Sequence, residues 1–328
     1  MKALVILVGF LFVVSFLLTY LVRFFALKHK VIDIPNERSS HSVPIPRGGG
    51  LAIVITWFVG VTILFSFGYI GSQLFYALLS GIILAMVSFL DDIFDLKPII
   101  RLLSQLLTAT LALYFLNGID SIHFYNFEFN IEFLLFPIAV IGIVWFINLF
   151  NFLDGIDGYA SIETISIALM IFFFTLDPIL LILVGCVLGF LIWNWPKAKI
   201  FMGDVGSTQL GFILIILGIF YHNENKLTIM QWIMISSPFW FDATITLYRR
   251  WRNKEKLSQA HRKHVYQRVV QSGFSHLRTD ISLVLINTLV FVLVFFSNKY
   301  ESLLLPCFIV IVIFLYIITK LVDKRVPF

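Results

Sequence analysis

Residues 89–96 read FLDDIFDL and close an apolar run that begins near residue 72. Three carboxylates, Asp91, Asp92 and Asp95, stand together at the end of this run. An unpaired carboxylate within a membrane-spanning helix costs about 2.5–3.5 kcal/mol on insertion scales. A chain that places three of them beside a hydrophobic run needs a polar, solvated surface to receive them.

The whole chain is strongly apolar. Of its 328 residues, 59% are hydrophobic and 13% are charged, and the mean hydropathy is +0.95. Because soluble domains carry about 25% charged residues, the composition predicts one polytopic membrane domain over residues 1–328. The net charge of +5 does not imply nucleic acid, since the sequence has neither zinc-finger spacing nor an RNP-like motif. Cys186 and Cys307 lie inside apolar runs and indicate neither a disulfide framework nor a metal cluster.

Eleven apolar runs are long enough to cross about 30 Å of hydrocarbon. Backbone polar groups in lipid must be satisfied internally, so we expect these runs to be helices, and the alternating pattern of a barrel is absent. The first run is interpreted as a retained span, because no small-residue cleavage site follows it. The runs are 3–24, 50–69, 72–90, 99–116, 133–151, 159–176, 178–194, 208–222, 228–247, 281–297 and 302–320.

Lys and Arg orient these runs. With the N-terminus outside, every Lys and Arg except Lys2, Lys226 and Lys299 falls on the cytoplasmic side, as the positive-inside rule requires. We therefore expect an all-α polytopic membrane protein of about eleven transmembrane helices with a cytoplasmic C-terminus. The polar motifs then all lie on the cytoplasmic face, in segments 38–50, 91–95, 148–158, 193–207 and 248–279.

The acidic residues of this face predict a metal site. Asp91 and Asp95 are four residues apart and would share a helix face, with Asp92 turned about 100° away. Asp154 and Asp157 would share a face if NFLDGIDG is helical. Carboxylates that converge need a cation, and oxygen ligands favour Mg²⁺, with Mn²⁺ as a substitute. The alternative is a set of helix caps and interfacial residues that reach water. The remaining acid is Asp204, which stands in FMGDVGS next to a glycine.

Two basic motifs predict anion binding. Arg47 stands beside three glycines in PRGGG (46–50), where N–H groups at the start of a helix could hold an anion; the alternative is an ordinary basic connector. The segment HRKHVYQR (261–268) carries His261, His264, Gln267 and Arg268, which suit a diphosphate or a lipid phosphate. Its alternative is a basic helix that lies on anionic lipid.

The segment WNW (193–195) ends another apolar run. Trp193 and Trp195 are interpreted as part of an interfacial aromatic belt. Asn194 differs, because an amide at a helix end can bind a sugar or a phosphate.

In order and spacing, these motifs resemble those of the polyprenyl-phosphate N-acetylhexosamine-1-phosphate transferases, a superfamily that includes the phospho-MurNAc-pentapeptide translocase. The resemblance covers residues 33 to 270 and is carried mainly by NLFNFLDGIDG (148–158) and FMGDVGS (201–207). It implies transfer of a sugar-1-phosphate from a UDP-sugar to undecaprenyl phosphate with release of UMP, in the bacterial inner membrane. The family also implies Mg²⁺ and a homodimer.

The resemblance also implies roles for single residues. Asp91, paired with Asp92, would be the base that deprotonates or positions the lipid phosphate, and Asp204 would be the principal Mg²⁺ ligand. Phe201 would stack on uracil, and Asn194 would lie near the substrate. The residues implied to bind the donor are Asn151, Asp154 and Asp157, with His261 and His264 at its diphosphate or sugar.

Two departures from the translocase concern the donor. Its run of consecutive histidines is replaced by HRKH (261–264), and its lysine- and threonine-rich N-terminal loop by RSSHSVPIPRGGG (38–50). Both changes resemble the O-antigen-initiating branch, whose donors are UDP-GlcNAc, UDP-FucNAc or UDP-QuiNAc. The translocase reaction is the alternative.

A secondary transporter is the alternative from another class. Transporters place charges near the bilayer midplane, often in two related halves, whereas these charges lie at one face and no internal repeat is evident. A CDP-alcohol phosphotransferase would need its acids within about twenty-five residues, and these extend from Asp91 to Asp204.

Overall fold

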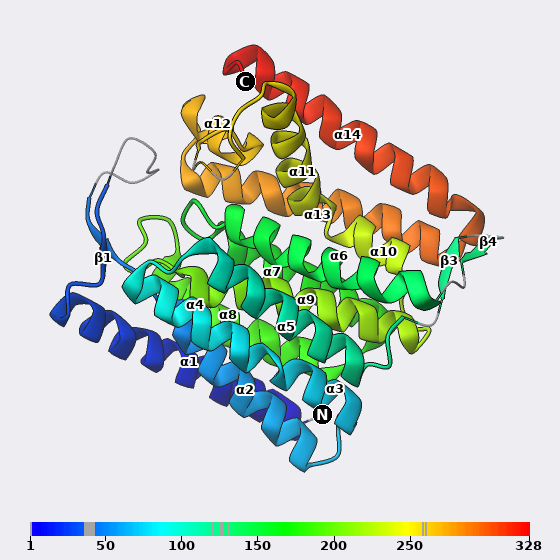
Figure 1. Cartoon of the computed structure of the whole chain (residues 1–328), viewed down its shortest axis with the longest axis horizontal. Coiled ribbons are helices and arrows are strands. Elements are labelled where there is room, and N and C mark those ends of the chain that lie inside the picture. Colours follow the sequence, from blue (N-terminus) through cyan, green and yellow to red (C-terminus); the bar gives the residue numbers. More distant parts are fainter. Residues whose placement is uncertain are drawn as a thin grey trace.

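The computed structural model describes residues 2–35, 43–119, 121–124, 127–129, 132–257, 259 and 261–328. The helices lie side by side in one bundle, with α1 at one edge and α14 at the opposite edge (Figure 1). Residues 38–42 of the basic segment 38–50 lie outside the described part of the chain. The elements are α1 (Lys2–Lys28), β1 (Ile32–Asp33), β2 (Ile45–Pro46), α2 (Gly50–Ser66), α3 (Ser72–Leu79), α4 (Gly81–Phe94), α5 (Pro98–Phe115), β3 (Ile122–Phe124), β4 (Phe127–Phe129), α6 (Glu132–Phe152), α7 (Tyr159–Thr175), α8 (Pro178–Asn194), α9 (Asp204–Asn223), α10 (Ile229–Ile235), α11 (Ser237–Arg252), α12 (Val265–Gln271), α13 (His276–Lys299) and α14 (Leu304–Arg325), with a 3₁₀ turn at Glu301–Leu303.

The helices confirm a polytopic membrane protein. Within the described ranges, seven helical segments are long and apolar enough to cross a membrane, and α3 and α4 together form one of them. Three shorter apolar helices, α2, α7 and α8, have 17 residues each, which is the lower limit for a span. Each predicted apolar run coincides with one of these helices, except the run 228–247.

That run is divided into two helices. α10 ends at Ile235, and α11 begins at Ser237 with Pro238 in its first turn. Proline lacks an N–H group and its ring clashes with the preceding turn, so it disfavours a helix interior and is tolerated in the first turn, where Pro238 stands. The count of eleven spans and the orientation of the chain therefore stay predictions.

Two short antiparallel hairpins depart from the expected all-α fold. β1 pairs with β2, and β3 pairs with β4 in the connection between α5 and α6. The first hairpin brings PRGGG close to the segment before α9. The backbone N–H groups of Gly49 and Gly50 donate to the carbonyls of Phe201 and Met202 (2.9 and 2.8 Å).

α9 forms the centre of the bundle. Almost all of its side chains are buried, and it packs against α2, α4 and α6. α2 and α9 cross where Gly50 meets Gly206: a Cβ on Gly50 would lie 2.3 Å from the Cα of Gly206. The third glycine of PRGGG thus permits a close helix crossing that fixes the start of α9.

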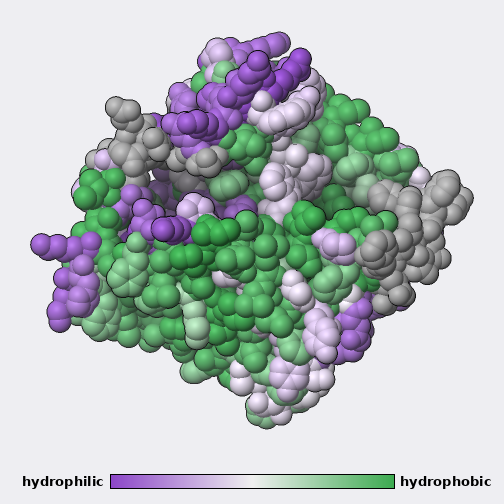
Figure 2. All heavy atoms as spheres, viewed as in Figure 1, coloured by the Kyte–Doolittle hydropathy of each residue, from purple (hydrophilic) through white to green (hydrophobic). Residues whose placement is uncertain are grey.

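The surface divides by polarity. Figure 2 shows a hydrophobic band over the sides of the helices, with hydrophilic residues gathered at the end that carries β1, α12 and the C-terminus. This is the end that holds the polar motifs predicted to be cytoplasmic.

Candidate active site

A cleft of about 390 Å³ opens among α4, α5, α6 and α9 at the hydrophilic end. It is also lined by Leu247 of α11 and by Leu257, Gln259, His261, His264 and Gln267. Its lining includes four predicted site residues, one acidic, one amide and two imidazole side chains: Asp204, Asn151, His261 and His264. Segments far apart in the sequence therefore meet in one polar cavity.

Asp91 and Asp92 are both buried, and they face different helices. Oδ1 of Asp92 accepts the backbone N–H of Asp204 (3.0 Å), and Oδ2 accepts that of Val205 (3.2 Å). Asp92 thereby satisfies free N–H groups at the N-terminus of α9, where the helix dipole favours a negative charge. Asp91 instead faces α5, where Oδ2 contacts Nη1 of Arg101 (3.0 Å).

Asp95 does not join these carboxylates. α4 ends at Phe94, and Asp95 is its exposed C-cap with a left-handed backbone (φ +50°). The prediction that Asp91 and Asp95 share a helix face, with Asp92 turned away, is therefore wrong. The helix stops one residue too early for it, and the acid that approaches α9 is Asp92.

Arg101 is a site residue that sequence reasoning missed. Its Nη1 lies 3.0 Å from Oδ2 of Asp91 and 3.6 Å from Oδ2 of Asp204, and the guanidinium lines the cleft. The sequence signal for Arg101 is a basic residue in the first turn of an apolar run, which the positive-inside rule uses only to orient the chain. Arg101 links the acids of α4 and α9.

Asp154 lies in the segment between α6 and α7, residues 153–158, which is not helical. The condition under which it would share a helix face with Asp157, a helical NFLDGIDG segment, is therefore not met. Burial raises the pKa of Asp154 well above its ordinary value, and the neighbouring carboxylates of Asp204 and Asp92 raise it further. Acids from three segments thus influence one another at the start of α9.

These acids fit a magnesium ion that is shared with a substrate. Among the described residues, no group of three or more His, Cys, Asp or Glu side chains forms a ready-made metal site. Mg²⁺ is commonly held by one or two carboxylates together with substrate phosphates and water. Asp204, with Asp154 near it, supplies such carboxylate oxygens at the edge of the cleft.

Asp157 and Asn194 hold loops together. Oδ2 of Asp157 accepts the backbone N–H groups of Lys197 and Ala198 (3.0 and 3.2 Å) and lies 3.1 Å from Nδ1 of His276. Burial alone would raise the pKa of Asp157, but the His276 contact and the N–H donors lower it. This positional role is what the structure shows for Asp157.

The amide of Asn194 is also fully engaged. Its Oδ1 accepts the N–H of Gly158 (2.9 Å), and its Nδ2 donates to the carbonyl of Ile200 (3.0 Å). Asn194 therefore joins the segment after α6 to the segment before α9. Substrate binding by Asn194 and Asp157 stays a prediction, and neither residue lines the cleft.

Amide and hydroxyl groups form the floor of the cleft. Ser207 donates to Oδ1 of Asn151 (2.8 Å), and Nδ2 of Asn148 donates to Oε1 of Gln105 (2.7 Å). Gln105 and Asn148 both line the cavity and were missed as site residues. In the sequence, both residues could have been recognised as amide side chains inside apolar runs. Donors and acceptors here suit the hydroxyl and carbonyl groups of a sugar or nucleotide.

The histidines enter the cleft from the segment before α12. His264 is buried at the N-cap of α12, with Nδ1 3.3 Å from Oδ1 of Asp242. Asp242 also accepts the backbone N–H groups of Val265 and Tyr266 (2.8 and 3.0 Å). The ring of His261 lies 4.8 Å from that of His264. Burial, followed by the nearby charge of His264, lowers the pKa of His261 to about 4.

Arg268 lies on the other side of α12. Its Nη2 contacts Oδ1 of Asp323 on α14 (2.8 Å) and the carbonyl of Val326, and its guanidinium lies 5.5 Å from the ring centroid of Phe328. The structure therefore does not bring Arg268 to the histidines, with which it was expected to bind a phosphate, because consecutive positions on a helix differ by about 100°. Gln267, one residue earlier, does line the cleft.

Arg47 and Phe201 lie at the base of the same region. Nη2 of Arg47 donates to the backbone carbonyl of Asp92 (2.6 Å). The Gly49 and Gly50 N–H groups are already bonded to carbonyls, so the anion site expected at those two groups is not formed. Phe201 is half-buried next to this pairing. Its stacking on uracil stays a prediction, as does substrate binding by Arg47.

The fold and the cleft define a multi-pass membrane enzyme with acidic, basic and imidazole groups at one end of its helices. Residues 74–222 match glycosyl transferase family 4. The chain is 30% identical to a probable undecaprenyl-phosphate N-acetylglucosaminyl 1-phosphate transferase of Bacillus subtilis over 96% of this chain and 92% of that protein. It is also 30% identical to an undecaprenyl-phosphate alpha-N-acetylglucosaminyl 1-phosphate transferase of Thermotoga maritima, over 79% of this chain and 80% of that protein.

A third relative is a phospho-N-acetylmuramoyl-pentapeptide-transferase of Streptococcus uberis, 30% identical over 62% of this chain and 67% of that protein. The chain belongs to glycosyl transferase family 4, within the polyprenyl-phosphate N-acetylhexosamine-1-phosphate transferases. It is a glycosyl-1-phosphate transferase, which confirms the predicted enzyme class over the transporter alternative.

Proposed function

We propose that this enzyme transfers N-acetylhexosamine 1-phosphate from a UDP-sugar to undecaprenyl phosphate and releases UMP. The observation that carries the proposal is the meeting of Arg101, Asp204 and His264 in one polar cleft at the end of an apolar bundle, where the buried Asp91 holds Arg101 from behind. UDP-GlcNAc is the first donor to test, because the two relatives that share the most of this chain are named for N-acetylglucosamine.

The chemistry is a displacement at the phosphorus that carries the sugar. An oxygen of the lipid phosphate forms a bond to this phosphorus, the bond to the bridging oxygen of the diphosphate breaks, and UMP leaves with that oxygen. Direct attack needs no covalent enzyme intermediate. The barrier is lowered by positioning and by cations that neutralise the developing charge.

The residues of the cleft have matching roles. Mg²⁺, held by Asp204 with the diphosphate, would supply positive charge at the leaving group. Arg101 and His264 would donate hydrogen bonds to phosphate oxygens. Asp91, held by Arg101, would position the attacking phosphate, and Asn151 would hydrogen-bond the donor.

An apolar groove offers a path for the prenyl chain. A second cavity of about 390 Å³ lies between α6 and α10–α11, with Trp145, Phe146, Trp232 and Trp240 among its lining residues. One turn further along α6, Asn148 lines the catalytic cleft. On α11, Thr244 lines the groove and Leu247 the cleft. A lipid whose chain lies in this groove would place its phosphate at the cleft.

The proposal also includes the membrane in which the enzyme acts, its oligomeric state and its pathway. The enzyme would act in the bacterial inner membrane, as a homodimer, in the first step of O-antigen or related envelope glycan synthesis. UDP-FucNAc and UDP-QuiNAc are further donors. The second candidate is the phospho-MurNAc-pentapeptide transfer, which is favoured by the several relatives that carry this name.

The test is UMP release by purified protein with undecaprenyl phosphate and Mg²⁺. The donor panel is UDP-GlcNAc, UDP-FucNAc, UDP-QuiNAc and UDP-MurNAc-pentapeptide. Release that requires both lipid and metal supports the proposal, and the preferred donor assigns the branch. Folded protein that releases no UMP with any of these donors would overturn it.

A further inference from the structure

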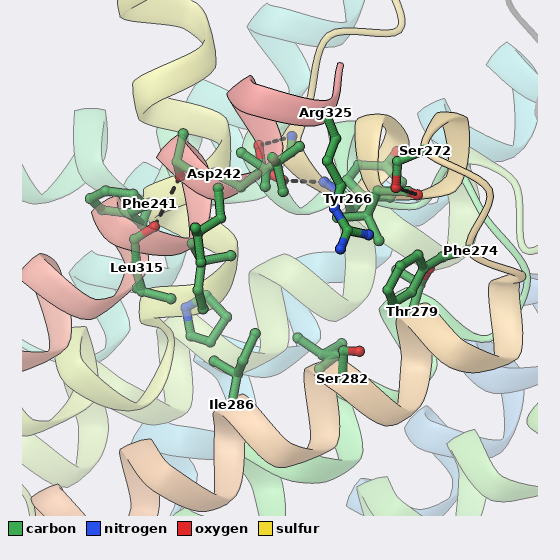
Figure 3. Close-up of a pocket in the computed structure, with 18 of the residues that line it drawn as sticks. Phe241, Asp242, Tyr266, Ser272, Phe274, Thr279, Ser282, Ile286, Leu315 and Arg325 are labelled. Atoms are coloured by element: carbon green, nitrogen blue, oxygen red, sulfur yellow. Dashed lines mark hydrogen bonds between the residues drawn. The ribbon is translucent and has the colours of Figure 1, made fainter. Parts of the chain in front are cut away.

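A cavity of about 550 Å³ lies among α11, α12, α13 and α14 (Figure 3). It follows the first turns of α13, from Thr279 to Ile286, and the last turns of α14, from Leu315 to Arg325. At 1.5 Å per residue it extends about 15 Å along α14. Its volume is within the range of about 300–1,000 Å³ that ligand pockets occupy.

The walls of this cavity are apolar. Figure 3 shows Phe241, Ile286 and Leu315 around its inner part, with Ser282 at one side. α13 and α14 are both candidate membrane spans. An apolar cavity between two such helices is chemically suited to a hydrocarbon chain, because burial of the chain removes no polar group from water.

The mouth of the cavity is basic. Lys324 and Arg325 are exposed at the end of α14, and neither makes an ion pair within the described chain. Figure 3 shows the Arg325 side chain extending into the cavity, with its guanidinium 5.9 Å from the ring centroid of Phe274. The nearest acid in the sequence, Asp323, is already paired with Arg249 and Arg268 (2.9 and 2.8 Å).

The back wall connects the cavity to the catalytic cleft. Asp242 and Tyr266 line the cavity. The same Asp242 carboxylate contacts Nδ1 of His264, which lines the cleft, and accepts the N–H of Tyr266. A molecule in the cavity therefore touches the group that holds this histidine.

We propose that the α11–α14 cavity binds one anionic phospholipid, with an acyl chain between α13 and α14 and the headgroup phosphate at Lys324 and Arg325. Two cations without carboxylate partners at the mouth of an apolar cavity match such a lipid, since each basic residue at an anionic surface favours binding. The binding site does not depend on the proposed reaction. Its effect on His264 through Asp242 rests on that proposed function.

The first experiment measures binding. The whole protein is placed in phosphatidylcholine nanodiscs that contain a trace of photoactivatable phosphatidylglycerol, and labelled peptides are found by mass spectrometry. We expect labels within 282–286 and 315–325. The double variant Lys324→Gln/Arg325→Gln should reduce labelling about tenfold or more. Lys226→Gln/Lys299→Gln removes the same charge at positions that do not line the cavity and should leave the labelling unchanged.

Three results would overturn the site. If a photoactivatable phosphatidylcholine labels the same peptides as strongly as the phosphatidylglycerol probe, the cavity holds surrounding bilayer lipid without selecting an anionic headgroup. Unchanged labelling in Lys324→Gln/Arg325→Gln would remove the headgroup contact. Displacement of the probe by an equimolar amount of undecaprenyl phosphate would mean that the occupant is the acceptor. Ser282→Phe fills the cavity without a change of charge and should also reduce labelling.

The second experiment measures the effect on turnover. With phosphatidylglycerol raised from zero to one third of the lipid, the UMP release rate of the unaltered protein should rise severalfold. Lys324→Gln/Arg325→Gln should keep the rate seen in phosphatidylcholine and lose the rise. An equal rise in this variant would refute the coupling to His264. Failure of the proposed reaction would leave every rate at zero while the labelling still decided the site.

Discussion

The catalytic cleft and the α11–α14 cavity meet at the contact between Asp242 and His264, and their linings are opposite in character. At the cleft, Arg101 contacts both the buried Asp91 and Asp204 and so fixes the two acids. In the cavity the walls are mainly apolar, and Lys324 and Arg325 make no ion pair among the described residues. Charged groups that are mutually fixed suit chemistry, whereas unpaired charges beside an apolar wall suit lipid binding.

The largest expected effect is at the metal ligand proposed for the cleft. Asp204→Asn removes a negative oxygen beside Arg101, so the transition-state charge loses its cation, and the UMP release rate should fall about 10³-fold or more. The variant should fold as the unaltered protein does. Asp95→Asn, an exposed acid at the end of α4, is the matched control and should retain its rate. Near-normal turnover in Asp204→Asn would remove the metal site from the cleft.

Arg101 tests whether the mutual contacts of the cleft matter for turnover. Arg101→Gln leaves Asp91 and Asp204 without their shared cation, and we expect a fall of about 10²-fold in kcat/KM, as for the loss of one positioned donor. Lys97→Gln removes an exposed charge one turn earlier and should change kcat/KM less than about threefold. Equal kinetics for both variants would assign Arg101 to membrane orientation alone.

Asp242 tests the wall that the two regions share. Asp242→Asn weakens the contact with Nδ1 of His264, and a fall of about 10- to 100-fold in kcat is expected, as for partners that orient a functional imidazole. Thr246→Val removes only the hydroxyl that donates to Asp242 (3.1 Å) and keeps the His264 contact. If Thr246→Val costs as much turnover as Asp242→Asn, the His264 contact is not the cause.

The smallest effect is on stability against pH. Burial lowers the pKa of His261 from its ordinary value of 6.5 to about 4. Between these values the unfolded chain binds the proton more readily than the folded one, so stability is complete above about pH 6.5 and decreases as the pH falls towards 4. His261→Asn should make the decrease in Tm over this interval smaller by about 2–4 °C. An identical decrease in both proteins would show that another group is responsible.

Most of the site residues predicted from sequence motifs reach the cleft, but one of them packs against a different helix. NLFNFLDGIDG and FMGDVGS pointed to Asn151 and Asp204, and the structure places both in the cleft. HRKH pointed to His261 and His264, which line it as well. Arg268 came from the same motif and lies against Asp323 on α14. Sequence spacing gives the angle between side chains on one helix but not the helix that each side faces.

The sequence by itself determined that the chain is a membrane protein of apolar helices and that its polar residues gather at one end, because burial in lipid and backbone hydrogen bonding act on each segment separately. Only the tertiary structure decided that Asp92 caps α9, that Arg101 links Asp91 to Asp204, and that Asp95 stays outside. Each of these contacts joins segments that are distant in the chain or depends on where a helix ends. Of these contacts, the one at the start of α9 lies next to the close crossing of α2 and α9 at Gly50 and Gly206.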